Sequence, residues 1–323
     1  MSPEVVGIGE VLIDFVATEP VSYIEVPAFQ KCFGGAPMNT LVGVARLGST
    51  SGAITAVGED PFGQFLIQEL KRNRVDTSRV KVKKGTLTTL AFVANEPETG
   101  ERSFIFYRKP WVSGTSDSAL SVQDVDFEYV KNAKILHVSG FALSQNPLRK
   151  AILSAVKHAR KEGVKVSFDP TLRLDVWNSE QTIRKLYRQM LKLSDIATFS
   201  REEAAFIFKT DDPEKAAKTS LKHGVNIVGI KLGVNGALVM TREGKKVHVP
   251  AFKVRAIDTT GAGDGWNAGL LVGILKEWDL ETCVTVANAV GALVVTKRGA
   301  ITALPYKNEL NSFLEQQNVG LRI

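Results

Sequence analysis

Small residues gather between Asp258 and Asp264, where the chain reads Asp-Thr-Thr-Gly-Ala-Gly-Asp. Glycines at 261 and 263 let the backbone approach a ligand closely, and the stretch opens a helical pattern whose first amides have no acceptor inside the helix. The helix macrodipole adds positive potential at the same place. Such a corner binds anions, phosphate in particular, so Gly261, Ala262 and Gly263 are candidates for an anion hole.

Asp264 stands in the first turn of this predicted helix, where it would repel an anion bound to the same amides. A purely binding role does not explain a carboxylate at that point. A general base that takes the proton from an attacking hydroxyl group does explain it. The structural alternative is that Asp264 stabilises the helix dipole, and the spacing alone leaves both interpretations open.

Two common nucleotide-binding motifs do not account for this stretch. The pattern Gly-x-x-x-x-Gly-Lys-Ser/Thr is absent, which excludes a P-loop. Residues 263–268 match the dinucleotide pattern Gly-x-Gly-x-x-Ala, but the rest of the chain, to residue 323, reads mostly as helix. A dinucleotide-binding domain needs several more strands after its motif, so a dehydrogenase is not expected.

Strand and helix patterns alternate over most of the chain. Apolar strand patterns lie at 5–9, 53–57, 135–139, 164–168, 196–199, 226–231 and 237–240. Helical patterns lie between them at 36–47, 61–73, 147–162, 179–193, 201–208 and 212–223, and return from 263 to about 297, where Gly291 is expected to interrupt the last helix. This alternation predicts an α/β fold, with a mostly parallel central sheet covered by helices.

The alternation breaks between about residues 81 and 108. Residues 87–95 and 104–108 predict a hairpin around a turn at 96–101, and an extended piece at about 23–33 could pair with it. We therefore expect one domain over residues 1–323 with a small β-strand lid drawn from about 11–33 and 86–112. So few strands need the main body or a second subunit, and an exposed lid strand suggests a homodimer through the lid.

Composition and charge exclude several other classes of protein. The chain has 323 residues, 44% of them hydrophobic, and a net charge of +7 without a basic tail. This surplus favours a small acidic partner, such as a nucleotide phosphate, over nucleic acid. Two distant cysteines and four scattered histidines predict neither a disulfide framework nor a histidine metal site. Without an apolar run of membrane-spanning length or a signal-peptide pattern, we expect no membrane partner and a cytoplasmic location.

Three stretches together resemble the PfkB-type, ribokinase-like carbohydrate kinases. The run at 258–264 is similar to the C-terminal signature of that family, and residues 34–39 followed by 42–48 are similar to the N-terminal signature. Residues 7–14 resemble the first strand with its sugar-contacting aspartate, and the likeness extends from about 5 to 305. It implies a three-layer α/β/α fold and an ATP-dependent sugar kinase that uses Mg²⁺. A catalytically silent sugar- or nucleotide-binding regulator on the same fold is the alternative from another class, and the intact Asp264 argues against it.

The resemblance also assigns roles at the sugar. Asp264 would be the catalytic base beside the anion hole, and the groups that hold sugar hydroxyls would be Asp14, Gly34, Gly35 and Asn39. A carboxylate and an amide suit hydroxyl groups, and a glycine pair lets a sugar ring lie against the backbone. The structural alternatives are a tight turn for the glycines and an ordinary helix position for Asn39.

Two further stretches point to the kind of sugar. Residues 168–173, with Trp177, resemble the fructokinase and ketodeoxygluconate kinase branches, although both usually carry Asn where Thr171 stands. Residues 104–108 resemble a fructokinase lid strand, although 109–113 depart from that branch. The resemblance therefore favours D-fructose, phosphorylated to fructose 6-phosphate, with 2-keto-3-deoxygluconate as the alternative. Tyr107, Arg108 and Arg173 would face the sugar; the structural alternatives are a buried aromatic ring for Tyr107 and an exposed charge for Arg108.

The remaining implied roles concern ATP and cations. Glu203 would hold Mg²⁺ through water, which suits an ion that dehydrates reluctantly, or would otherwise be a helix-terminal carboxylate. Asp258 and Thr260 would border a monovalent cation such as K⁺, although Ala303 replaces a serine of the best-known cation-activated members. The nucleotide would be held by Lys231, Gly233, Gly236 and Asn288. The family commonly has Thr at position 231, and a lysine there could still reach a phosphate.

Overall fold

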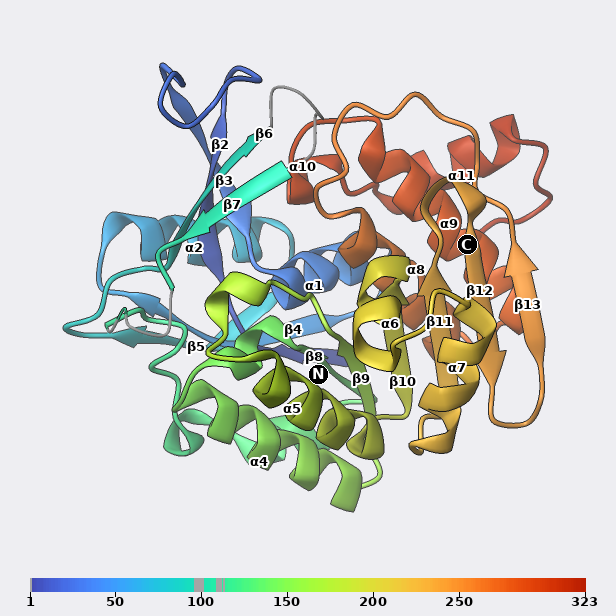
Figure 1. Ribbon diagram of the computed structural model, residues 1–323, viewed down its shortest axis with the longest axis horizontal. Coiled ribbons are helices and arrows are strands. Elements are labelled where there is room, and N and C mark those ends of the chain that lie inside the picture. The colour runs from blue at the N-terminus through green and yellow to red at the C-terminus, as the bar shows by residue number, and fades with distance from the viewer. Residues whose placement is uncertain (1, 96–101, 109–111, 113) are drawn as a thin grey trace.

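The computed structural model describes residues 2–95, 102–108, 112 and 114–323. Within them the chain forms a large central sheet with the strand order β13-β12-β11-β10-β9-β8-β1-β4-β5 (Figure 1). The seven strands from β11 to β5 in that order are parallel to their neighbours. Strands β12 and β13 add an antiparallel edge. The strands are β1 (Val5–Ile8), β4 (Ser51–Gly58), β5 (Asp76–Lys83), β8 (Ile135–Ser139), β9 (Lys165–Asp169), β10 (Ile196–Ser200), β11 (Ile227–Lys231), β12 (Ala237–Thr241) and β13 (Lys246–Val249).

Helices cover both faces of this sheet. One apolar core packs between the sheet and α1, α2, α8, α9 and α11, and the other lies against α3 to α7. Strand β1 contributes Val5 to the first core and Val6 to the second, as the alternation of side chains along a strand requires. The helices are α1 (Ala36–Arg46), α2 (Pro61–Arg72), α3 (Phe127–Lys131), α4 (Leu148–Lys161), α5 (Glu180–Leu193), α6 (Arg201–Phe208), α7 (Pro213–Lys222), α8 (Ala262–Leu275), α9 (Leu280–Val295), α10 (Ala300–Ala303) and α11 (Lys307–Gln316).

A second, four-stranded sheet stands beside the first with the order β3-β2-β6-β7 (Figure 1). Its strands are β2 (Leu12–Ala17), β3 (Phe29–Gly34), β6 (Leu90–Asn95) and β7 (Arg102–Phe106), and we call this sheet the lid. Pairing is antiparallel except between β2 and β6. The predicted turn at 96–101 and residues 109–111 lie outside the described residues.

The lid joins the main body where β1 runs into β2 and β3 runs into α1. Gly35 lies at this junction with φ of 112°, and a Cβ atom there would be 2.6 Å from the carbonyl oxygen of Glu10. Only glycine combines that backbone conformation with such a close approach. The sequence Gly34-Gly35 therefore allows the two connections between the sheets, from β1 to β2 and from β3 to α1, to lie side by side.

The predicted fold class is confirmed, with differences in individual elements. Strand β5 and strand β13 were not expected, because both are charged edge strands with little apolar patterning. The predicted interruption of the last long helix at Gly291 is wrong, since α9 continues through it. A glycine inside a helix costs only about 1 kcal/mol, which burial of the surrounding Val and Ala side chains outweighs.

Candidate active site

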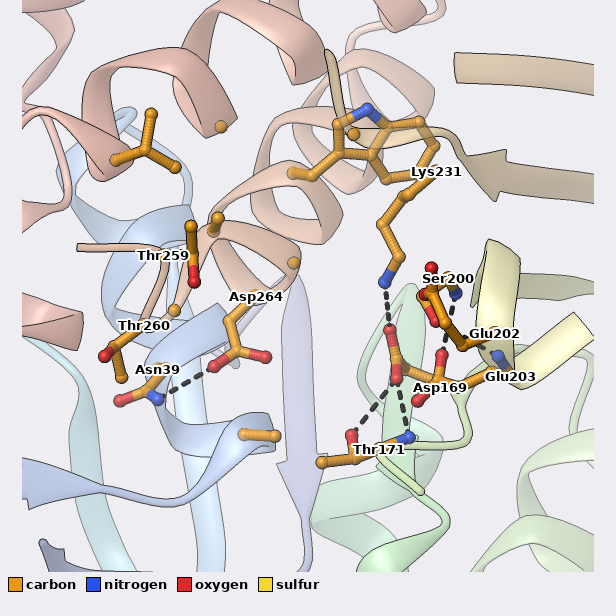
Figure 2. A pocket seen from close by; sticks show the side chains of 18 of the residues that line it. Asn39, Asp169, Thr171, Ser200, Glu202, Glu203, Lys231, Thr259, Thr260 and Asp264 are labelled. Atoms are coloured by element: carbon orange, nitrogen blue, oxygen red, sulfur yellow. Dashed lines mark hydrogen bonds and ion pairs between the residues drawn. The ribbon is translucent and has the colours of Figure 1, made fainter. Parts of the chain in front are cut away.

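A cavity of about 1280 Å³ lies between the lid and the carboxyl ends of the central strands. This edge is where open parallel sheets generally bind their ligands. The cavity extends from Asp14 on the lid to Asn288 on α9, and the start of α8 forms its middle. Figure 2 shows that the side chains of Asn39, Asp169, Lys231 and Asp264, which come from four different elements, gather in it.

Helix α8 begins inside this cavity. Gly261 is its N-cap with φ of 76°, and a Cβ atom there would lie 2.9 Å from the Cα of Ala300. Gly261, Ala262 and Gly263 all line the cavity, so the structure brings the expected anion-hole residues together. The Lys231 ammonium lies beside Gly263. A Cβ atom at position 263 would be 3.3 Å from Lys231 Nζ.

Asp264 lies in the first turn of α8, as the sequence predicts, and faces the cavity. Its Oδ2 accepts a hydrogen bond from Asn39 Nδ2 at 2.8 Å (Figure 2). The pKa of Asp264 is raised to about 6, mainly by burial; the Asn39 hydrogen bond opposes this shift and the charge of Asp169 adds to it. A carboxylate with a pKa near the working pH is suited to accept a proton during a reaction.

Asp169, at the end of β9, is a site residue that the sequence analysis did not single out. Its Oδ2 accepts hydrogen bonds from Lys231 Nζ at 2.6 Å, Asn267 Nδ2 at 2.7 Å and Thr198 Oγ1 at 3.1 Å. Its Oδ1 accepts the backbone amide of Thr171 at 2.8 Å. Burial acts to raise the pKa of Asp169, but Lys231 and these donors hold that pKa well below its usual range. Its place at the carboxyl end of a parallel strand was the available signal.

Glu203 is fixed by the backbone around it. Its Oε2 accepts the amide of Ser200 at 2.7 Å in a capping box at the start of α6 (Figure 2). Its Oε1 accepts the amide of Leu172 at 2.9 Å. Burial, followed by the charge of Asp169, raises the pKa of Glu203. The residues that the structure describes contain no group of three or more metal-ligating side chains. A Mg²⁺ ion held mainly by phosphate and water, with one carboxylate nearby, is compatible with this donor set.

The far end of the cavity is lined by Gly233, Gly236 and Asn288, three of the four residues expected at the nucleotide. Gly233 and Gly236 both have positive φ in the turn between β11 and β12, and Gly236 packs directly on the backbone of Val249. Asn288 donates from Nδ2 to the carbonyl oxygens of Val249 and Pro250, at 3.0 and 3.1 Å. Its Oδ1 accepts the indole NH of Trp266 at 2.8 Å, so this side chain fixes the wall of the cavity.

The lid end of the cavity is aromatic on one side and acidic on the other. Phe104, Phe106 and Phe141 line it together with Asp14, and the guanidinium carbon of Arg173 lies 4.8 Å from the centroid of the Phe104 ring. Gly35 and Asn39 also line this end, whereas Gly34 does not. A Cβ atom at Gly34 would lie 2.4 Å from the Asp14 carboxylate, so this glycine makes room for Asp14.

Glu10 is a buried carboxyl at the junction of lid and main sheet that the sequence analysis also missed. It accepts the backbone amide of Ala36 at 3.2 Å and the hydroxyl of Ser139 at 2.5 Å. Burial raises the pKa of Glu10 to about 7, against the opposing effect of the Ser139 bond. The residue therefore ties the start of α1, at the lid end of the cavity, to strand β8.

The structure does not bring Tyr107 and Arg108 to the cavity, contrary to the expectation that they face the sugar. Tyr107 follows β7 on the opposite face of the lid from Phe106, is 55% exposed and packs against Phe92 at 5.5 Å between ring centroids. Arg108 is fully buried and its Nε lies 2.6 Å from Asp117 Oδ2. The structural alternatives are also wrong, because Tyr107 is not a buried aromatic ring and Arg108 is not an exposed charge.

Asp258 and Thr260 are placed together beside the anion hole. Asp258 Oδ1 accepts the amide and the hydroxyl of Thr260 at 2.8 and 2.7 Å, and its Oδ2 accepts the amide of Gly299 at 2.8 Å. Thr260 lines the cavity and Asp258 does not. Asp258 thus holds the loop before α8 against the loop after α9.

Comparison with known proteins gives a consistent result. The model of the pfkB family of carbohydrate kinases matches residues 2–307. The chain is 39% identical to the Arabidopsis thaliana protein named probable fructokinase-6, chloroplastic, over 97% of this chain and 83% of the relative, and 36% identical to fructokinase-1 of Zea mays, over 97% and 98%. The crystal structure of fructokinase from Vibrio cholerae with bound fructose, ADP and calcium ion superimposes with a TM-score of 0.85, at 33% identity, covering 97% of this chain and 100% of that one.

The fold and the site therefore define the class. The chain belongs to the pfkB family of carbohydrate kinases, and its fold is the ribokinase-like α/β fold. It is an ATP-dependent carbohydrate kinase. Among its described residues, no helix is long and apolar enough to cross a membrane.

Proposed function

We propose that this protein is a fructokinase, which transfers the γ-phosphoryl group of ATP to D-fructose and forms fructose 6-phosphate. The observation that carries the choice of sugar is the charge at the lid end of the cavity. Asp14 lies at that end and Asp264 lies next to it in the middle of the cavity, whereas Arg108, the second arginine expected at the sugar, is paired with Asp117 inside the protein. A neutral polyol suits this environment, because carboxylates accept hydrogen bonds from hydroxyl groups and repel an acid. The similarity to fructokinases supports the same choice.

In this proposal, Asp264 accepts the proton of the attacking sugar hydroxyl. That oxygen forms a bond to the γ-phosphorus, the bond between this phosphorus and the β–γ bridging oxygen breaks, and ADP leaves with the electron pair. The amides at the start of α8 and the Lys231 ammonium stabilise the charge on the transferred group. Asn39 orients Asp264, and its Oδ1, which has no partner among the described residues, is placed to accept a sugar hydroxyl.

We further propose that Glu203 holds Mg²⁺ through water, the ion entering with ATP. Mg²⁺ supplies charge neutralisation of the triphosphate in such reactions. Replacing Glu203 by Gln is expected to raise the Mg²⁺ concentration needed for half-maximal rate and to leave the KM for the sugar unchanged. An unchanged Mg²⁺ titration would favour a structural role for this carboxylate as a helix cap.

A monovalent cation site is part of the same proposal. Asp258 joins the loops at 258–260 and 296–300, whose backbone carbonyls would bind an ion such as K⁺. Activity with K⁺ and with tetramethylammonium, at matched ionic strength, tests this. Equal rates in the two salts would remove the cation from the proposal and leave Asp258 as a loop anchor.

The second candidate substrate is 2-keto-3-deoxygluconate, and one observation favours it. Arg173 lines the lid end of the cavity and could pair with a carboxylate. The deciding experiment measures kcat/KM for fructose, 2-keto-3-deoxygluconate, ribose and glucose at saturating MgATP. We expect fructose to lead by at least tenfold, which corresponds to about 1.4 kcal/mol of transition-state binding. A tenfold lead for the sugar acid, or turnover of none of these sugars, would overturn the fructose assignment.

The lid also supports a proposal about assembly. Its strands β3 and β7 are sheet edges, and Ile105 and Tyr107 are 41% and 55% exposed on its outer face. We propose that a second copy of the chain covers this face, which would shield unpaired strand edges. Light scattering of the protein and of Ile105→Glu tests it; a wild-type monomer at all concentrations would contradict it.

The cytoplasmic location stays a prediction that cell fractionation can test.

A further inference from the structure

We propose that Asp169 and Lys231 act as one positioning unit for phosphoryl transfer: Asp169 holds the Lys231 ammonium beside the anion hole and, through Asn267, fixes the helix that presents Asp264. This inference rests on the proposed function, in which Asp264 is the base. It adds Asp169, which lies within the stretch 168–173 but has no role assigned from the sequence.

The contacts of Asp169 link the three strands and the helix that build the site. Asp169 ends β9, its donor Thr198 lies on the neighbouring β10, and Lys231 ends β11 on the far side of β10. Asn267 belongs to α8 and lies one turn after Asp264. A single carboxylate oxygen accepts all three donors, so a shift of β9, β11 or α8 would break at least one of these bonds (Figure 2 shows the Lys231 bond).

The position of Lys231 connects this arrangement to catalysis, because the ammonium lies at the expected anion hole. Its Nζ is bound to Asp169 at 2.6 Å and stands next to Gly263, within the expected anion hole. The side chains of Lys231 and Asp169 are 16% and 7% exposed, so water screens them little. A buried ion pair is often no more stabilising than well-packed apolar residues of the same size, so fold stability alone does not account for it. A cation kept in one place where phosphoryl charge develops needs no rearrangement during the reaction.

The same pair acts on Asp264 in opposite directions. Asp264 is faced by Asn39 from α1, by Arg173 from the segment after β9, by Lys231 from β11 and by Asp169 from β9. The Asp169 charge raises the pKa of Asp264, whereas Lys231 and Arg173 lower it. Neutralising Asp169 should therefore lower the pKa of Asp264, and neutralising Lys231 should raise the pKa of Asp264.

The test compares Asp169→Asn, Lys231→Met and the double variant with the wild type. The rate kcat is measured from pH 5 to 8.5 at saturating MgATP, with the sugar that the wild type phosphorylates fastest. We expect kcat to fall at least tenfold in each single variant, and the double variant to lose no more than the worse single one. We also expect the acid limb of the profile to move to lower pH in Asp169→Asn and to higher pH in Lys231→Met, by about half a unit or more.

Asp195→Asn is the matched control. Asp195 directly precedes β10 at the opposite end of the same strands, where it accepts the amide of Val166 at 2.9 Å and the side-chain amide of Asn226 at 3.2 Å. This variant should keep the wild-type profile even where its thermal stability falls. If a single variant at the pair does not fold, the uncharged double variant decides the question, because wild-type kcat in it would overturn the proposal.

Other outcomes separate this inference from the proposed function. Independent, additive losses with an unmoved acid limb would show that the two residues are only structural and would overturn the pairing. An acid limb that survives in Asp264→Asn would instead remove Asp264 as the base. A preference for a sugar other than fructose would change the substrate but not the result for Asp169 and Lys231.

Discussion

At the residue scale, Arg108 forms a fully buried ion pair with Asp117. Arg108 follows an aromatic strand, as an arginine that binds sugar would, yet the fold buries it against Asp117. Asp117 also accepts a hydrogen bond from the hydroxyl of Thr89. Thr89 precedes β6 and Arg108 follows β7, so Asp117 holds both ends of the lid hairpin. No local pattern could have shown this, because the partners come together only through the packing of lid and main body.

Arg108→Met should therefore affect stability more than sugar recognition. The substitution leaves the Asp117 carboxylate buried without its cation, and breaking such a pair typically costs about 3 to 5 kcal/mol. Urea unfolding measures the loss, and the KM for fructose should change less than threefold. A large rise in KM with unchanged unfolding would restore Arg108 to the sugar site.

Glu10 should make the stability of the protein depend on pH. Because burial raises the pKa of Glu10 from 4.5 to about 7, the folded protein holds its proton more tightly than the unfolded chain. The corresponding stability, on the order of 3 kcal/mol, is present below pH 4.5 and is lost as the pH rises towards 7 and above. Urea unfolding at pH 5.5 and pH 8 should show Glu10→Gln losing much less stability between the two than the wild type. Equal losses in both proteins would mean that Glu10 does not titrate in this range.

At the scale of elements, the start of α8 was well predicted from the sequence, and the structure shows why. Small residues followed by a carboxylate are a local signal, and the site there depends on backbone amides that belong to the same few residues. Asp169 depends instead on donors from β10, β11 and α8, which no local pattern connects.

Gly263→Ala separates catalysis from stability at this helix start. The added Cβ would meet only the flexible end of Lys231, at 3.3 Å, and alanine is the better helix former. We expect unchanged or slightly higher thermal stability and a kcat at least tenfold lower, since the methyl group enters the anion hole. Gly236→Ala is the contrast, because its Cβ would collide with the backbone of Val249, so that variant should lose stability. Normal turnover in Gly263→Ala would exclude close approach of a phosphoryl group to this backbone.

At the scale of the whole molecule, alternation of strand and helix patterns was enough to predict the helix-covered sheet and the lid hairpin. The strand that pairs with this hairpin is β2, not the expected segment at 23–33. The order of strands, and hence which strand ends meet, was not predictable from it, because that order depends on pairings between distant segments. The cavity between lid and sheet follows from that order: it brings Asp14 from the first lid strand to the same space as Asp264 and Lys231. The two ends of the cavity then differ in character, with aromatic rings and carboxylates at the lid and glycine-rich turns at the other end.

The measurement that tests the central claim most directly is the single-turnover rate of Asp264→Asn beside the wild type, with MgATP and fructose both saturating. Asn keeps the size of the side chain and a hydrogen bond to Asn39 but cannot accept the proton, and a general base typically contributes about 10² to 10⁴ in rate. We predict binding of both substrates within about threefold of the wild type and phosphoryl transfer at least roughly 100-fold slower. Transfer at more than a tenth of the wild-type rate would contradict the assignment of Asp264 as the base.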